Sequence, residues 1–288
     1  MKAKRHRANK GLGQNFLYDP AIARKIVDAT GVGPDDTVVE LGPGRGILTR
    51  ELVSRGVKLI ALEIDGALVQ QLKEEFEGFA AGGAVSLTRA EILNEDFSKI
   101  PLSGLLAARN TDRCTLVGNI PYYLTRDVLF SFLVYENEII NAAYIMVQKE
   151  VGDRIVSPPG SRVYGITSVI LQSLYDVSVV TRVAPGSFTP RPRVASVVLE
   201  FKPLVQPLLK PQELGSFVKL VKNLFQQRRK TISNTLKAFY SLRDPDFAVI
   251  ETETGIDFGL RPENLSKVEF LYLSRSLTGL ANGSSEPR

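Results

Sequence analysis

The feature that most constrains the fold is an alternation of short, apolar, β-rich runs with segments of helical periodicity between residues 37 and about 203. Parallel strands need long crossover connections, which are usually helices, so the alternation predicts a mostly parallel sheet with helices on both faces. The last two runs have no helix-length segment between them and are expected to form an antiparallel edge hairpin. The predicted strands are 37–41, 58–64, 84–89, 114–118, 142–148, 177–183 and 194–201. The predicted helices include 47–55, 66–77, 126–136 and 166–175.

A smaller helical domain is expected to follow the sheet. The strand signal ends after residue 203 in a proline-rich stretch, and residues 213–240 then place apolar side chains at helical spacing. Another helix is expected from Pro262, because proline is favoured in the first helical turn. We therefore predict an α/β domain over residues 1–203 and a small all-α domain over residues 207–288.

The rarity of cysteine and histidine narrows the chemistry. The 288 residues include one cysteine, Cys114, on a predicted strand, and one histidine, His6, in a charged N-terminal segment. Zinc sites, catalytic triads and histidine proton shuttles need clusters of these residues, so no metal site is expected and Cys114 is expected to be a core residue. No apolar run approaches the ~18 residues that a membrane span requires. A cytoplasmic protein is therefore predicted.

The basic charge is concentrated in two segments without acidic residues. The net charge is only +5, yet residues 1–18 hold five cations and residues 214–243 hold seven. Such runs are often solvated surface, but thirty residues with seven cations and no acid favour a polyanionic partner. The cations expected to bind it are Lys4, Arg5, Arg7, Lys10, Lys222, Arg228, Arg229 and Lys230.

A glycine-rich turn joins the first predicted strand to the first predicted helix. The sequence "ELGPGRG" (40–46) carries Gly42, Gly44 and Gly46, and the next strand ends at Glu63, 21 residues after Gly42. A carboxylate at this distance is typical of ribose binding in nucleotide-binding folds. The turn alone has a purely steric explanation, but the two features together favour a nucleoside cofactor. The turn lacks the G-x-G-x-x-G spacing of nicotinamide sites, and the carboxylates of Glu40, Glu63 and Glu91 suit the cationic S-adenosylmethionine.

The sequence "NIPYYL" (119–124) follows the buried run 114–118. Its amide would lie at the carboxyl edge of the sheet, where α/β folds bind ligands. Asn119 and a backbone carbonyl beside Pro121 could accept hydrogen bonds from the exocyclic amine of adenine and direct its lone pair toward a methyl group. Tyr122 could stack on the base. A simple X-Pro turn is the alternative interpretation, and in isolation the two are comparable.

Eight motifs, in order along nearly the whole chain, resemble the ribosomal RNA adenine dimethyltransferases of the KsgA/RsmA type. They are "GQNFL" (13–17), "ELGPGRG" (40–46), "LEID" (62–65), "NIPYYL" (119–124), "MVQKEVGDRI" (146–155), "YGITSVILQ" (164–172), "FTPRPRV" (188–194) and "QRRKTISNTL" (227–236). The resemblance implies a Rossmann-like S-adenosylmethionine-dependent methyltransferase domain with a helical RNA-binding domain. It also implies two methyl transfers to each of two adjacent adenosines near the 3′ end of small-subunit ribosomal RNA, in an immature subunit, by a monomeric enzyme.

The resemblance also assigns residues to roles. It implies a catalytic site of Asn119, Pro121, Tyr122 and Phe188, with Tyr122 and Phe188 sandwiching the adenine, and RNA contacts from Arg191 and Arg193. The implied cofactor contacts are Asn15, Leu17, Gly42, Gly44, Glu63, Ile64, Glu91, Ile92 and Asn119. Phe188 could instead anchor its loop to the core. The chain departs from the family pattern with Leu12 in place of a bulkier residue, Glu91 in place of aspartate and Ala195 in place of aspartate.

Three alternatives share the scaffold. Enzymes that dimethylate a large-subunit adenosine tend to have serine and lysine in the glycine turn, where this chain has "GPGRG". DNA adenine methyltransferases use the same Asn-x-Pro-Tyr chemistry, which the motif alone does not distinguish. Transcription factors descended from the family bind nucleic acid without catalysis, but the intact glycine turn and Asn119 favour an enzyme.

Overall fold

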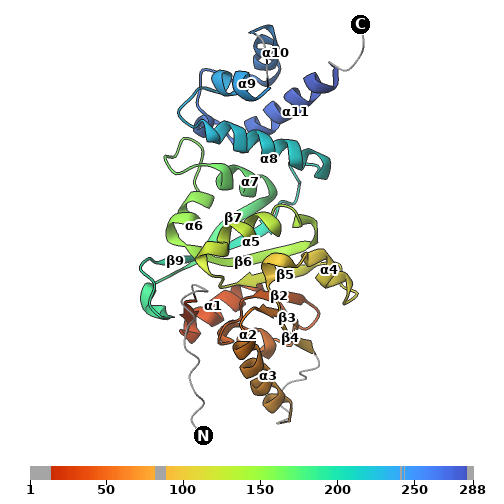
Figure 1. Ribbon diagram of the computed structural model, residues 1–288, viewed down its shortest axis with the longest axis vertical. Helices are drawn as coiled ribbons and strands as arrows, with labels where there is room; N and C mark the ends of the chain where they lie inside the picture. The colour runs from red at the N-terminus through yellow and green to blue at the C-terminus, as the bar shows by residue number, and fades with distance from the viewer. Residues whose placement is uncertain (1–13, 82–88, 241, 243, 284–288) are drawn as a thin grey trace. The chain divides into compact units, whose positions relative to one another are not determined.

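The α/β part of the chain is built on a mixed seven-stranded sheet (Figure 1). The computed structural model describes residues 14–81, 89–240, 242 and 244–283. The strand order is β4-β3-β2-β5-β6-β9-β7; the first five strands are parallel to their neighbours, and β9 is antiparallel to β6. The strands are β2 (Thr37–Leu41), β3 (Lys58–Glu63), β4 (Ala90–Asn94), β5 (Cys114–Gly118), β6 (Ile140–Gln148), β7 (Tyr175–Val183) and β9 (Ser196–Pro203). The mostly parallel sheet with β9 and β7 together at one edge is confirmed.

The strand order creates a ligand crevice between β2 and β5. From β2 the chain proceeds outward through β3 and β4, and it then returns to β5 on the other side of β2. Ligands in open α/β sheets bind at such a reversal, outside the carboxyl ends of the strands. The glycine turn follows β2 and Asn119 follows β5, so both predicted motifs lie at this reversal.

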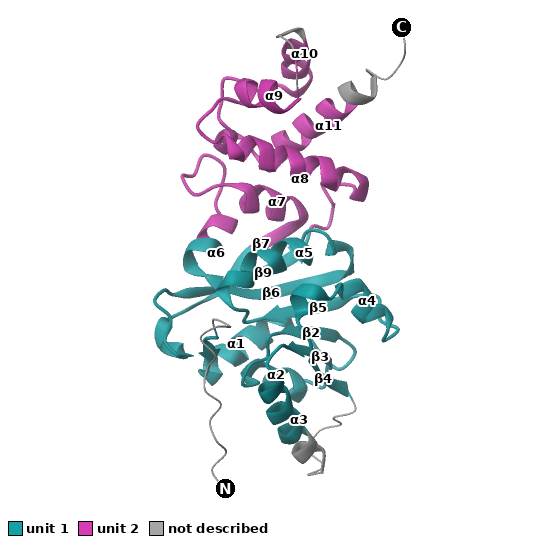
Figure 2. Cartoon of the chain, in the orientation of Figure 1, with its two compact units in different colours: residues 1–152, 178–203 teal, residues 153–177, 204–288 magenta. Residues whose placement is uncertain are grey.

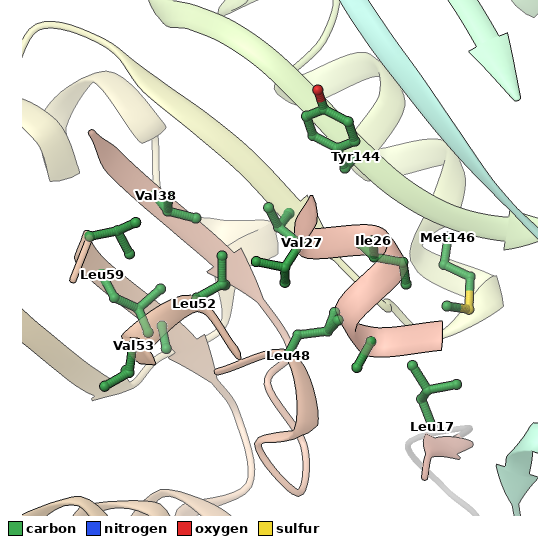
Figure 3. Close-up of a cluster of buried hydrophobic side chains, with 14 of the residues drawn as sticks. Leu17, Ile26, Val27, Val38, Leu48, Leu52, Val53, Leu59, Tyr144 and Met146 are labelled. Carbon is green, nitrogen blue, oxygen red and sulfur yellow. The ribbon is translucent and has the colours of Figure 1, made fainter. Parts of the chain in front are cut away.

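Three helices cover one face of the sheet. They are α1 (Pro20–Thr30), α2 (Ile47–Ser54) and α3 (Gly66–Ala81). Side chains alternate between faces along a strand, so Val38 of β2 and Leu59 of β3 point to this side and pack with Ile26 of α1 and Leu52 of α2 (Figure 3). Tyr144 of β6 belongs to the same cluster, and its hydroxyl donates to the carbonyl of Ala29 at 2.9 Å. This core fixes the positions of the turns that follow β2 and β3.

One strand prediction falls in a different place. Most of the predicted third strand, residues 84–88, lies outside the described residues, whereas the strand that pairs with β3 is β4, with Glu63 opposite Asn94. The strand therefore ends at residue 94 rather than 89, and this moves the residues that reach the carboxyl edge of the sheet.

Several helices differ from their predicted bounds. Helix α1 was not predicted, although Asp19 caps it by accepting from the N–H groups of Ala21 and Ile22 and Pro20 occupies its first turn. The predicted helix at 126–136 is α5 (Thr125–Ser131), and the predicted helix at 166–175 is α7 (Ile166–Leu174). Two short helices were also not predicted, α4 (Leu102–Ala107) and α6 (Lys149–Ile155).

The C-terminal region is helical, as predicted, but it consists of more and shorter helices than the sequence pattern indicates. Residues 213–240 do not form one helix, because α8 (Pro211–Gln226) ends before the basic cluster and α9 (Ile232–Tyr240) begins after it. Helix α10 (Asp244–Thr254) follows. Pro262 begins a 3₁₀ turn, and α11 (Lys267–Gly283) starts five residues later. No helix of the described residues is long and apolar enough to cross a membrane.

The chain divides into two compact units (Figure 2). The first comprises residues 1–152 and 178–203, and the second comprises residues 153–177 and 204–288. The second unit thus contains α7 in addition to the C-terminal helices, because α7 contacts α8 and α11. Compactness does not say which segments bind cofactor or RNA, so the functional division into residues 1–203 and 207–288 stays a prediction.

A two-stranded antiparallel ribbon joins two motifs that are far apart in sequence. Strand β1 (Phe16–Leu17) pairs with β8 (Phe188–Thr189), with Leu17 opposite Phe188. Outside the ribbon, the N–H of Tyr18 donates to the carbonyl of Ser187 at 3.0 Å. Phe16 and Leu17 of the N-terminal motif are therefore paired with Phe188 and Thr189 of the proline-rich motif.

Candidate active site

A cavity of about 300 Å³ opens at the carboxyl edge of the sheet, within the first unit. The N-terminal ribbon, the turns after β2 and β3, the turn after β4 and the "NIPYYL" segment all contribute to its wall. Of the residues predicted from the sequence, the cavity wall contains Asn15, Leu17, Gly42, Gly44, Glu63, Ile64, Asn119, Pro121 and Tyr122. The structure thus brings together four motifs that lie far apart in the sequence, and adds the turn after β4, which no predicted motif includes.

Glu63 organises the glycine turn. One of its carboxylate oxygens accepts from the N–H of Gly44 and the other from the N–H of Asp65, each at 3.0 Å. Burial raises the pKa of this carboxyl above its ordinary value, while the hydrogen bonds from Asp65 and Gly44 act in the opposite direction. Each carboxylate oxygen has a second lone pair, so Glu63 can also accept from a ligand hydroxyl at the cavity wall.

Gly44 is required by both its backbone conformation and its surroundings. Its φ is +56°, and a Cβ built there would lie 2.9 Å from Cδ1 of Phe16. The Phe16 ring is also contacted by the guanidinium of Arg45, 4.6 Å from the ring centroid. Any larger residue at position 44 would be strained at this φ and would push against the Phe16 ring.

Glu40 places a second carboxylate at the same cavity. It is 1% exposed, and its Oε2 has no hydrogen-bond partner among the described residues. Burial raises its pKa to about 8, and the charge of Glu63 acts in the same direction. A buried polar atom without a partner is costly, so an unpaired carboxylate oxygen beside a cavity indicates a place for a ligand donor or cation.

Asp96 is a functional candidate that sequence reasoning missed. Asp96, Phe97 and Ser98 line the cavity, whereas the predicted Glu91 and Ile92 do not. Glu91 instead pairs with Arg109, whose Nε lies 2.7 Å from Oε2 of the carboxylate. Hydrogen bonds from Ser98, with a smaller contribution from Lys99, lower the pKa of Asp96. The signal was present in the sequence, because Asp96 precedes a serine in the spacing of an Asx turn that ends a strand.

Asn119 and Tyr122 lie in the cavity wall, on the segment that follows β5, the strand next to β2. A Cβ on Gly42 would lie 3.9 Å from the carbonyl oxygen of Asn119, so the two turns approach closely. The Asn119 side-chain nitrogen donates weakly to the carbonyl of Asn15 at 3.5 Å, and Tyr122 is half-buried. Pro121 precedes a 3₁₀ turn, η4 (Tyr122–Leu124), that directs this segment along the cavity wall.

Phe188 is not in the cavity wall. It is 3% exposed and belongs to the core cluster that includes Leu17 and Met146. The alternative interpretation, a loop anchor packed on the core, describes this structure. The implied sandwich of Tyr122 and Phe188 around an adenine stays a prediction. Cys114 is buried as predicted, and burial raises the pKa of its thiol to about 12.

The predicted cations have different environments. Lys4, Arg5, Arg7 and Lys10 lie outside the described residues. Arg191, Arg193, Arg229 and Lys230 are exposed, and Lys222 is half-buried. Arg228 is held within the second unit, because its guanidinium donates to Glu263 at 3.2 Å and to the carbonyl of Arg162 at 2.7 Å. Within the described residues no group of three potential metal-ligating side chains is found.

Sequence comparison shows which family the chain belongs to. A family model described as "Ribosomal RNA adenine dimethylase" matches residues 5–278. The chain belongs to the ribosomal RNA adenine dimethylase family. Its relatives include proteins named "Ribosomal RNA small subunit methyltransferase A" from Geobacter metallireducens, 40% identical over 97% of this chain and 99% of the relative, and from Halothermothrix orenii, 36% identical over 93% and 88%. The predicted family resemblance is confirmed.

Solved structures support the fold assignment of this ribosomal RNA adenine dimethylase. A dimethyladenosine transferase from Plasmodium falciparum has a TM-score of 0.74 at 22% identity, covering 92% of this chain and 98% of the other. A 23S rRNA methyltransferase, ErmE, has a TM-score of 0.69 at 24% identity, covering 92% and 100%. The Rossmann-like methyltransferase fold with a C-terminal helical region is therefore confirmed.

Proposed function

We propose that this dimethylase transfers methyl groups from S-adenosylmethionine to N6 of adenosines in small-subunit ribosomal RNA. The single observation that carries the proposal is Asn119 in the wall of the cavity that also contains the glycine turn and Glu63. The relatives at 36–40% identity are named for the small subunit. Family resemblance supplies the finer target, two adjacent adenosines near the 3′ end in an immature subunit, each methylated twice.

The residues of the cavity fit S-adenosylmethionine. The carboxyl groups of the cavity, those of Glu40, Glu63 and Asp96, suit a ligand with two cationic groups. The unpaired Oε2 of Glu40 is a buried acceptor. Glu63 would accept from the ribose hydroxyls, and Asp96 would accept from the adenine amine of the cofactor. When bound, the cofactor supplies a methyl group already activated by its sulfonium.

The acceptor amine needs orientation more than a strong base. The exocyclic nitrogen of adenine gives its lone pair to the ring, so acceptors on both of its hydrogens favour a tetrahedral nitrogen. Asn119 Oδ1 and a carbonyl beside Pro121 would provide these acceptors, and Tyr122 would stack on the base. An adenosine within a duplex would first have to leave its stack.

Separate alanine substitutions of Asp96 and Glu91 test which carboxylate binds the cofactor. We expect Asp96→Ala to weaken S-adenosylmethionine binding about tenfold, since a hydrogen bond to a charged group contributes roughly 1.5–3 kcal/mol. Glu91→Ala, the matched loss of a carboxylate outside the cavity, is expected to leave the dissociation constant within twofold. Isothermal titration of both variants measures this; a larger loss in the Glu91 variant would restore the original assignment.

The exposed cations are expected to bind RNA phosphates. RNA affinity should fall steeply with salt, and Arg229→Ala and Lys230→Ala should each reduce the slope of log K against log salt by about one. Lys73→Ala removes an exposed cation of α3, outside both basic segments, and serves as the control. Filter binding at several salt concentrations gives the slopes, and a flat response in the wild-type protein would exclude phosphate binding.

Labelled cofactor distinguishes the proposed substrate from its alternatives. The protein is incubated separately with undermethylated small subunits, large-subunit RNA and adenine-containing DNA. We expect label in dimethyladenosine of small-subunit RNA. Label only in large-subunit RNA or DNA would favour the corresponding alternative enzyme, and RNA binding without transfer would favour a transcription factor. A cytoplasmic location and a monomeric state are also proposed, and light scattering tests the latter.

A further inference from the structure

The hydroxyl of Tyr122 is tied to a side chain outside the cavity. It forms a hydrogen bond with Oγ of Ser196, at a distance of 2.7 Å. Ser196 is not among the cavity residues, and its side chain is 0% exposed. This serine therefore reaches the cavity only through the tyrosine.

The anchor is rigid because Ser196 belongs to the sheet. It is the first residue of β9 and pairs with Gln148 of β6. The neighbouring backbone is held as well, since the N–H of Lys149 donates to the carbonyl of Ala195 at 2.9 Å. Tyr122, in contrast, lies in the short 3₁₀ turn η4, none of whose residues is fully buried.

A hydrogen bond at the far end of a tyrosine fixes the direction of the ring axis. The hydroxyl lies on the axis from Cβ through the ring, so a bond there restrains χ1 and fixes where the ring lies in the cavity wall, but not the rotation of the ring about that axis. We propose that Ser196 is a positioning residue, which holds the Tyr122 ring in the place where it stacks on the acceptor adenine beside Asn119. The proposal rests on the proposed function, since it gives the ring a base to hold.

If Ser196 positions the tyrosine, removing either hydroxyl of the hydrogen bond should lower kcat by the same factor. Ser196→Ala and Tyr122→Phe both remove the bond and keep the ring, so each should lower kcat about five- to tenfold on undermethylated small subunits, because a neutral hydrogen bond contributes about 1 kcal/mol. The double variant should lose no more than either single variant, because the two groups act as one unit. The dissociation constant for S-adenosylmethionine should stay within twofold, and Ser196→Thr should recover most of kcat.

A buried serine elsewhere controls for general destabilisation. Ser173 is 2% exposed, and its Oγ donates to the carbonyl of Val169 within α7 at 2.7 Å. Ser173→Ala should lower the melting temperature without lowering kcat at 25 °C. If Ser196→Ala leaves kcat within twofold of wild type, or if its loss and that of Tyr122→Phe multiply in the double variant, the inference is wrong. If the wild-type protein methylates no RNA, the proposed function fails instead.

Discussion

Replacing Asn119 with alanine should reduce methyl transfer by at least about 10²- to 10³-fold in kcat, which is the usual loss when one preorganised group that stabilises a transition state is removed. The amide oxygen of Asn119 is the only side-chain acceptor that "NIPYYL" places in the cavity wall besides the tyrosine hydroxyls. Without it, the acceptor amine keeps its lone pair in the adenine ring. Initial rates on undermethylated small subunits, with saturating cofactor, measure the loss.

The same variant separates chemistry from folding. Asn119 follows β5, and among the described residues its side chain makes one weak hydrogen bond, 3.5 Å to the carbonyl of Asn15, so its loss should change the melting temperature little. Asn141→Ala, at an exposed position of β6, is the matched control and should keep full activity. Unchanged turnover in the Asn119 variant would refute its role, whereas a large fall in melting temperature would point to a structural one.

The fully buried strands of the sheet were predictable from their apolar runs, whereas the edge strand β4 was not. Strands β2 and β5 are buried at every position, and their apolar runs appear directly in the sequence. Strand β4 is an edge strand with only one neighbour, and it keeps exposed polar residues such as Glu91. The more β-rich run just before it therefore gives the stronger strand signal, which puts Glu91 at the predicted carboxyl edge, whereas the carboxylate that lines the cavity is Asp96, five residues later.

Contacts distant in sequence were also beyond prediction from local pattern. An aromatic residue in a loop can stack on a ligand or anchor the loop, and nothing near Phe188 in sequence decides between them. Its burial depends on pairing of β8 with β1, more than 170 residues away. The same applies to Arg228, which was predicted from charge alone to bind RNA, but whose partners Glu263 and Arg162 lie far along the chain.

Replacing Glu40 with glutamine should stabilise the cofactor-free protein, and the gain should grow as the pH rises. Glu40 follows Val39 on β2 and points to the same sheet face as Val38, toward α2. The groups that face it are Glu63, which raises its pKa, and Thr49 and Arg50, which lower it. Burial dominates these effects and raises the pKa from its ordinary value of 4.5 to about 8.

The direction of the pH dependence follows from this raised pKa. Below about pH 4.5 the carboxyl is neutral in both folded and unfolded chains, and its contribution to stability is fully present. As the pH rises toward 8, the unfolded chain loses the proton first, so the folded state loses stability by about 1.4 kcal/mol for each unit of pKa shift. Above the folded pKa the carboxylate is ionised in both states, and the loss reaches its full value of about 5 kcal/mol.

Urea unfolding of wild-type and Glu40→Gln protein at pH 5.5 and 8.5 measures this loss, because glutamine has no proton to release. The difference in unfolding free energy between variant and wild type should increase by roughly 3 kcal/mol between the two pH values. Glu74→Gln, which removes an exposed carboxylate of α3, controls for the change in net charge. An equal difference at both pH values would mean that Glu40 is already ionised in the folded protein at pH 5.5, and that its buried Oε2 is stabilised by a partner such as Arg50 or water.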